Sequence, residues 1–257
     1  GTVLSSQTGW SEVEFLQPLQ GGLELDVDVK ASSARFHVAP DARNLSGKLV
    51  LKDNELQWRN LVAEWFGGDL AGHIALANRD ATALWSGQLQ LKDADLQTMV
   101  WKRDGFAIAA GDLDLSASFE GAGKSMRAII ASLAGSGILE TRGLEIEGLE
   151  NESLPQILSA SDDESFALNN DSVSEMTARI LSNGSFYADA LTVPFTMAAG
   201  TIRMPNIVLE DAGASVRGGV RIDLVDEAVN ARFDLEFDAE EDALSGSAPA
   251  LGLIFLG

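Results

Sequence analysis

The chain of 257 residues contains no cysteine and only two histidines. The absence of cysteine excludes disulfides and thiolate chemistry. His37 and His73 each lie within an alternating strand pattern, and the sequence has no His-x-x-His pair and no Gly-x-Ser-x-Gly motif. We therefore predict no catalytic residue, no metal ligand and no cofactor, and we expect that the protein is not an enzyme.

Positive charge is also scarce. The sequence has 18 lysine and arginine residues against 39 aspartate and glutamate residues, which gives a net charge of -21. Such a surface repels phosphate backbones and anionic membrane surfaces. Nucleic acid is therefore not expected as a partner, and any contact with lipid has to be apolar.

Long hydrophobic runs are absent as well. The longest apolar stretch, Ala248–Gly257, has ten residues, whereas a membrane-spanning helix needs about 20. The chain starts with glycine and ends within the apolar run Leu251–Leu256. These features predict an excised fragment of a longer protein, from which targeting signals have been removed.

The dominant pattern that is present is strict alternation of apolar and polar residues. Residues 23–30, 112–119 and 231–238 each place apolar side chains at every second position. Side chains of a strand point alternately to opposite faces, so each segment has one apolar and one solvated face. Sheets of this kind are usually antiparallel. The sequence therefore predicts a mainly β protein with a long twisted antiparallel sheet, a few short helices and strand content well above the typical ~20–25%.

Two internal repeats support this prediction. Residues 46–53 recur as residues 86–93, and Lys-Asp-Asn and Lys-Asp-Ala at their ends favour turns. Over a longer range, the apolar positions of residues 54–91 match those of 200–237 at a constant spacing of 146. We expect these two segments to be equivalent β-meanders, with Leu70 and Val216 on corresponding faces.

Helical patterns are few. The segment 124–134 offers Ser125 as N-cap and places Ile129, Ile130 and Leu133 on one face. Shorter helices are predicted at 153–160 and 172–181. The polar, acidic stretch 161–171 is predicted to be a loop that separates a first half, residues 1–160, from a second half, residues 172–257, within one continuous domain.

Residues 109–148 carry a distinctive order of elements. The alternating strand 111–117 leads to the turn Gly121-Ala122-Gly123-Lys124-Ser125, a helix that ends in Ala131-Ser132-Leu133-Ala134-Gly135, a further strand, and the Gly-containing segment 141–149. This order resembles the C-terminal region of the AsmA family, which is related to TamB and YhdP. Residues 66–72 and 213–224 are similar to strand pairs of that family.

The resemblance implies a protein of the Gram-negative cell envelope, in which the long sheet is curled into an apolar-lined groove with an apolar concave face. It implies location in the periplasm, tethering of the full-length protein to the inner membrane, and a role in outer-membrane assembly or in moving phospholipid between the inner and outer membranes. The expected partners are phospholipid or another acyl-chain ligand and, in addition, envelope proteins. The proposed lipid contacts are the apolar members of the alternating segments: Leu70, Ile74, Leu76, Leu89, Leu91, Val216, Val220, Ile222, Phe233, Leu235 and Phe237.

Two alternatives remain at this point. In the first, the apolar face is closed as a sandwich core, and exposed strand edges recruit partners to a scaffold that regulates outer-membrane protein assembly. The second is a carbohydrate-active or calcium-binding β domain, for which the sequence lacks aromatic–carboxylate clusters and calcium-loop spacing. An apolar face that is open and wider than its own side chains can fill would favour lipid binding over the scaffold.

Overall fold

The computed structural model is mainly β and is dominated by one long antiparallel sheet. It describes residues 9–15, 24–35, 40–79, 81–100, 102–103, 105–149, 156, 169–181, 184–211, 214–237 and 250–256. Twelve strands form the sheet in the order β1-β2-β3-β4-β5-β8-β9-β10-β11-β12-β13-β14. The strands are β1 Leu25–Ala34, β2 Ala42–Lys52, β3 Glu55–Trp65, β4 Gly68–Arg79, β5 Thr82–Asp95, β8 Ala109–Gly123, β9 Ala134–Glu147, β10 Ser185–Ala198, β11 Thr201–Asp211, β12 Ala214–Asp223, β13 Ala228–Phe237 and β14 Ala250–Leu256. The predicted fold class is confirmed.

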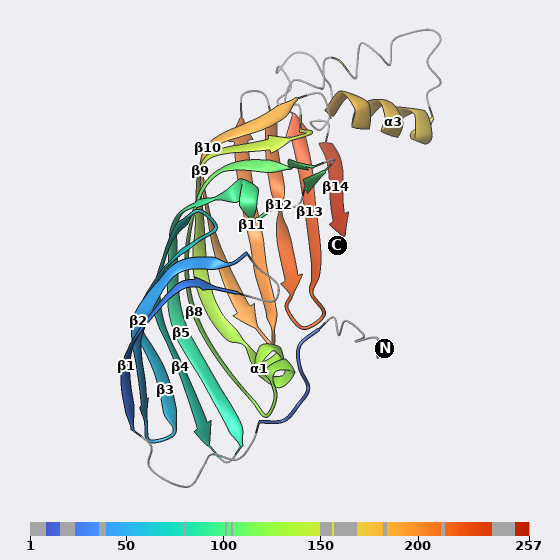
Figure 1. The fold of residues 1–257 in the computed structure, drawn as a ribbon. Coiled ribbons are helices and arrows are strands. Elements are labelled where there is room, and N and C mark those ends of the chain that lie inside the picture. Colours follow the sequence, from blue (N-terminus) through green and yellow to red (C-terminus); the bar gives the residue numbers. More distant parts are fainter. Residues whose placement is uncertain are drawn as a thin grey trace, which may run out of the picture.

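Short elements complete the described chain. The 3-10 helix η1, Leu96–Thr98, leads to a small hairpin of β6, Lys102–Arg103, and β7, Phe106–Ala107. Helix α1 is Met126–Ser132, and helix α3 is Asn170–Leu181. Figure 1 shows the sheet as a strongly twisted, curved layer, with α1 at one end of the strands and α3 beyond the other end.

One face of the sheet is apolar from β1 to β13. Directly opposed residues of an antiparallel pair lie on the same face, so the register can be followed from strand to strand. One such row contains only apolar residues and glycine: Val27, Leu49, Trp58, Ile74, Gly87, Phe119, Gly135, Met197, Ile202, Ile222 and Val229. We call this side of the sheet the apolar face and the opposite side the polar face.

The predicted 146-residue repeat is present in the first hairpin of each meander. Strands β3 and β11 begin and end at equivalent positions, and the bulge between Trp58 and Leu61 recurs between Met204 and Ile207. Leu70 and Val216 are both buried on the apolar face. The two segments are therefore equivalent in fold at this hairpin, as predicted.

The second hairpin of each meander differs by two residues. Leu70 is opposed to Leu91, whereas Val216 is opposed to Leu235 and not to Phe237. The reason is the connecting loop, since Arg79 pairs with Thr82 but Asp223 pairs with Ala228. A shift of two residues preserves the face, because side chains alternate with a period of two.

The turn predicted at Lys92-Asp93-Ala94 is wrong. The chain does turn at Asp53 and Asn54, but strand β5 continues to Asp95 with a bulge between Leu91 and Ala94. Asp53 and Asp93 share a left-handed backbone, with φ of 52° and 53°. At Asp93 this conformation belongs to the bulge and not to a turn. The bulge is stabilised by the Asp93 backbone N–H, which donates to the Asp114 carboxylate of the neighbouring strand at 2.7 Å.

The helical predictions have three outcomes. Helix α1 lies within 124–134, and the Ser125 hydroxyl accepts a hydrogen bond from the Ala128 N–H, which confirms the N-cap. Helix α3 begins at Asn170, so Asn170 and Asp171 belong to a helix and not to the loop expected at 161–171. The segment predicted as helix at 153–160 lies outside the described residues except for Gln156, which is helical.

Candidate functional site: an apolar groove in the curled sheet

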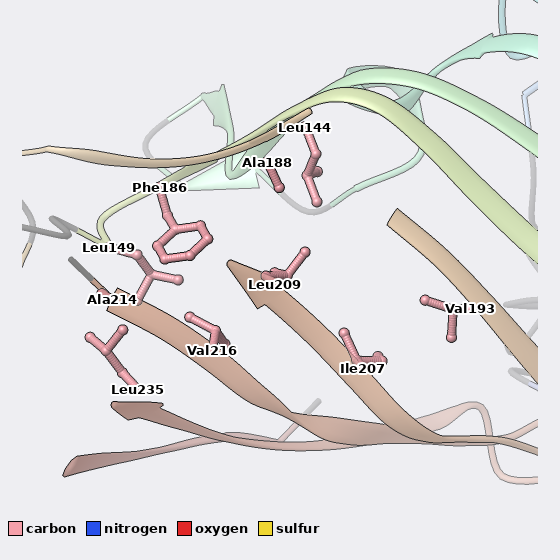
Figure 2. Close-up of a cluster of buried hydrophobic side chains, with 10 residues drawn as sticks. All are labelled: Leu144, Leu149, Phe186, Ala188, Val193, Ile207, Leu209, Ala214, Val216 and Leu235. Carbon is pink, nitrogen blue, oxygen red and sulfur yellow. The ribbon is translucent and has the colours of Figure 1, made fainter. Parts of the chain in front are cut away.

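The curl of the sheet brings two sets of strands face to face. Figure 2 shows Leu144, Phe186 and Ala188 pointing from β9 and β10 toward residues of β11 and β12. Ile207, Leu209 and Val216 point back toward them from the facing strands. Phe186 and Leu235 are fully buried in this cluster. This part of the apolar face is therefore closed by its own side chains.

The facing strands also leave space, and five residues of this cluster border it: Leu144, Leu149, Ile207, Leu209 and Val216. A groove of about 340 Å³ lies on the apolar face between the facing strands, within the range typical of ligand sites. Its walls come from η1 and the segment that follows it, and from six strands. The residues that line it are Leu96, Val100, Ile108, Ala109, Leu113, Leu139, Thr141, Leu144, Ile146, Leu149, Leu191, Ile207, Leu209, Val216, Val220, Val229, Ala231 and Phe233. Apart from Thr141, every one of these residues is apolar.

Thr141 departs from this apolar lining. The residue is 97% buried, and among the described residues its hydroxyl has no hydrogen-bond partner. A buried hydroxyl without a partner costs free energy, so it is not explained by folding alone. The Thr141 hydroxyl is itself buried, so the surface that the groove offers to an occupant is apolar and carries no charge.

Helix α1 lies at one end of the strands (Figure 1). The helix lies directly on the apolar face of β8, where a Cβ at Gly123 would be 2.5 Å from the Ile129 backbone nitrogen. At its C-terminal end the Leu133 carbonyl accepts from the Gly200 N–H in the β10–β11 turn at 3.1 Å. The Leu224 N–H of the β12–β13 turn in turn donates to the Gly200 carbonyl. One short helix thus connects the two facing sets of strands at this end of the sheet.

An N-terminal segment, residues 9–15, forms hydrogen bonds with α1 and with the β12–β13 turn at this end of the sheet. The Trp10 indole N–H donates to the Leu224 carbonyl at 2.6 Å, and the Arg127 backbone N–H donates to the Ser11 carbonyl at 3.0 Å. The Arg127 guanidinium also pairs with Glu12 and with Asp226. The end of the sheet near α1 is therefore held by several polar contacts.

The predicted lipid-facing residues all fall on the apolar face by register, but they do not all reach the groove. Val216, Val220 and Phe233 line it, and Leu235 is buried in the adjoining cluster. Ile222 follows Val220 on the same face of β12. Phe237 is opposed to Ala214 in the ladder, and its side chain lies outside the described part of the structure.

The candidates in the first half form a different environment. Leu70 and Leu91 are buried in a second apolar cluster, against which Leu89 packs. Ile74 is half-buried on the same face, and Leu76 is 39% exposed. The apolar face is thus packed around Leu70 and Leu91 and open to solvent near Leu76 and on β1, where Leu25 and Val27 are exposed.

Several groove residues were not singled out from the sequence. Leu139, Leu144 and Ile146 of β9 and Leu191 of β10 were missed, as were Ile207 and Leu209 of β11. The sequence does carry a signal for the last two, since both lie in the second repeat and match Leu61 and Ala63. The repeat predicted from the sequence, 54–91 and 200–237, does not include β9 or β10, so their place opposite β11 follows only from the curl of the sheet.

Charged groups lie on the polar face, away from the groove. The Arg142 guanidinium binds the Asp114 carboxylate at 2.7 Å and also pairs with Asp93, which links strands β9, β8 and β5. The hydrogen bond from Arg142, aided by the backbone N–H of Asp93, holds the pKa of Asp114 below its usual value. Nearby, the Tyr187 hydroxyl donates to Glu145 at 2.8 Å, which raises the pKa of that hydroxyl. These contacts join neighbouring strands of the sheet.

His73 is exposed on the polar face, beside Ser86, Gln88 and Ser118 in a shallow depression. His37 lies outside the described residues. In the part of the chain that the structure describes, no cluster of three or more histidine, aspartate or glutamate side chains is placed to bind a metal ion. Within the same residues, no helix combines the length and apolarity needed to cross a bilayer.

Comparison with known proteins gives one match. No curated protein and no solved structure matches this chain. The model of the AsmA family matches residues 5–186, which is more than half of the 257 residues and includes strands β1 to β9. The resemblance inferred from residues 109–148 is confirmed. Membership in this family is consistent with a role in envelope biogenesis or lipid transport. The chain belongs to the AsmA family.

Proposed function

We propose that the groove holds an acyl chain and that the protein takes part in moving phospholipid between the inner and outer membranes. The main observation in support is the groove itself. Its lining is apolar except for Thr141, and its own side chains do not fill it. Each methylene group removed from water contributes about 0.8 kcal/mol, so an acyl chain is held without any charged pocket. The proposed site of action is the periplasm, with the full-length protein tethered to the inner membrane.

The charge of the protein supports an apolar mode of binding. A net charge of -21 does not attract anionic headgroups. Charged groups such as Arg142 and Asp114 bind one another on the polar face. We further propose that the protein performs no chemistry on the lipid, which it holds and releases.

The scaffold alternative rests on a different observation. Phe186 and Leu235 are fully buried between facing strands, as in a sandwich core. If the whole groove collapsed in the same way, the apolar face would serve stability alone, and partners would bind at the strand edges. The two functions make opposite predictions for bound lipid.

The experiment compares two neighbouring residues of β12. Val220 lines the groove, whereas Arg221 is exposed on the polar face. Native mass spectrometry of protein purified from bacterial envelopes should show bound lipid in the wild type and in Arg221→Asp, but much less in Val220→Asp. The reason is that an acyl chain would have to desolvate an unpaired carboxylate at position 220. Lipid-free wild type together with an unfolded Val220→Asp variant would contradict the proposal and favour the scaffold.

A further inference from the structure

The ladder between β10 and β11 is unusually short. Within these two strands, which the structure describes completely, only Thr196–Arg203, Met197–Ile202 and Ala198–Thr201 are paired. Strand β10 nevertheless continues for 11 residues before Thr196 and pairs with β9 over most of that length. The side of β10 that faces β11 therefore lacks a ladder from residue 195 to residue 188. We call this interval the seam.

Two prolines stand where the ladder stops. Ala199 and Gly200 form a two-residue turn with positive φ at both positions, so Ala198 and Thr201 are a hydrogen-bonded pair. Such pairs recur at every second step, at Thr196–Arg203 and then at the position of Pro194 and Pro205. At that step each residue would have to donate its N–H to the other, and proline has none. The sequence thus removes two hydrogen bonds at one point.

The first repeat provides an internal control. The residues equivalent to Pro194 and Pro205 are Lys48 and Arg59, which are directly opposed in the β2–β3 ladder. That ladder continues, with irregularities, as far as the Arg43–Glu64 pair. The same hairpin architecture therefore stays paired without the prolines, which identifies them as the cause of the seam.

The seam is bounded at its far end and lined by apolar side chains. The Tyr187 backbone N–H donates to the Asp211 carboxylate at 3.0 Å and connects the two strands again. Between this contact and Thr196, Val193 of β10 lies across from Ile207 of β11 (Figure 2). Leu191 and Ile207, one from each side of the seam, both line the groove. Opening the seam therefore separates apolar side chains but breaks no backbone ladder.

We propose that the seam is a lateral portal through which an acyl chain passes between the exterior and the groove. This inference rests on the proposed function. The end of the sheet near α1 is held by hydrogen bonds of Gly200, Leu224 and Trp10. At the seam, in contrast, β10 and β11 can separate without breaking ladder hydrogen bonds. Pro194 and Pro205 are both exposed, so the portal faces solvent on the polar face.

The test closes the seam with a disulfide, which is unambiguous because the chain has no cysteine of its own. In Pro194→Cys/Pro205→Cys the two Cα atoms would be about 5.5 Å apart in a closed ladder, within reach of a disulfide. The probe is a fluorescent dodecanoic acid, and its uptake is followed by stopped-flow fluorescence. We expect the oxidised variant to load about tenfold more slowly, or slower still, than the same variant after reduction. Lys48→Cys/Arg59→Cys, which joins strands already paired, should load at the wild-type rate in both redox states.

A second variant does not depend on disulfide formation. Pro194→Lys/Pro205→Arg transfers the residues of the first repeat, restores both N–H donors and should extend the ladder, with slower uptake and greater protection of the seam amides from hydrogen exchange. Uptake at the wild-type rate in a closed variant would overturn the portal and leave the lipid-binding function in place. A wild type that takes up no probe at all would overturn both proposals.

Discussion

At the scale of single residues, Thr141 is the polar exception in the described lining of the groove. Its hydroxyl is buried and has no partner among the described residues. Because valine has nearly the same shape without the hydroxyl, Thr141→Val should raise the free energy of unfolding by about 1 kcal/mol. Urea denaturation at 25 °C measures this change, with the exposed Thr192→Val as the control. A loss of stability in Thr141→Val would show that the hydroxyl has a partner in solution.

Arg142 gives a prediction about pH. Its guanidinium lowers the pKa of Asp114 from the usual 3.8, so the contact stabilises the fold above that pH and is lost as the pH falls through the lowered value. Arg142→Gln should therefore lower the melting temperature at pH 7, and the difference from wild type should shrink below pH 4. Arg221→Gln, which removes an exposed arginine elsewhere on the polar face, should show no such pH dependence. A constant difference between pH 7 and pH 3 would contradict the assignment.

At the scale of elements, the seam makes a prediction that is independent of lipid. In the alternation that begins at Ala198, the N–H groups of Ala190 and Thr192 point toward β11, where no ladder receives them. Their hydrogen exchange should be faster than that of Ser46 and Lys48, the equivalents of Thr192 and Pro194, which lie in the paired β2–β3 ladder. Exchange measured by NMR on the apo protein tests this. Equal protection at the two sites would mean that β10 and β11 pair fully in solution.

The strands and helices also show which structural features can be predicted from sequence patterns and which cannot. Alternation placed the apolar side chains of β4, β5, β12 and β13 on one face, and Ser125 marked the start of α1. Alternation says nothing about strand ends, because Asp53 and Asp93 take the same backbone conformation but make a turn in one case and a bulge in the other. The two prolines that open the seam are visible in the sequence. That Pro194 and Pro205 lie at opposed positions of β10 and β11 depends on the turn at Ala199 and Gly200, which fixes the register of these strands.

At the scale of the whole molecule, the groove depends on how the sheet curls. Leu191 and Val220 are on strands that are not adjacent, yet both line the same cavity. The period of two assigns each of them to a face but does not determine whether that face meets another part of the sheet, solvent or a ligand. The division of the apolar face into a closed cluster around Phe186, an open groove and an exposed margin near Leu25 is therefore a property of the three-dimensional fold.

The most direct test of the central claim maps where an acyl chain lies in the wild-type protein. A fatty acid that carries a diazirine near its methyl end is bound, cross-linked by light, and located by mass spectrometry of the digested protein. We predict adducts on groove residues of β9 and β11–β13, such as Leu139, Ile207 and Val220, and loss of these adducts in Val220→Asp. Adducts confined to the polar face, or no adducts in folded protein, would contradict the account of the apolar face as an acyl-chain site.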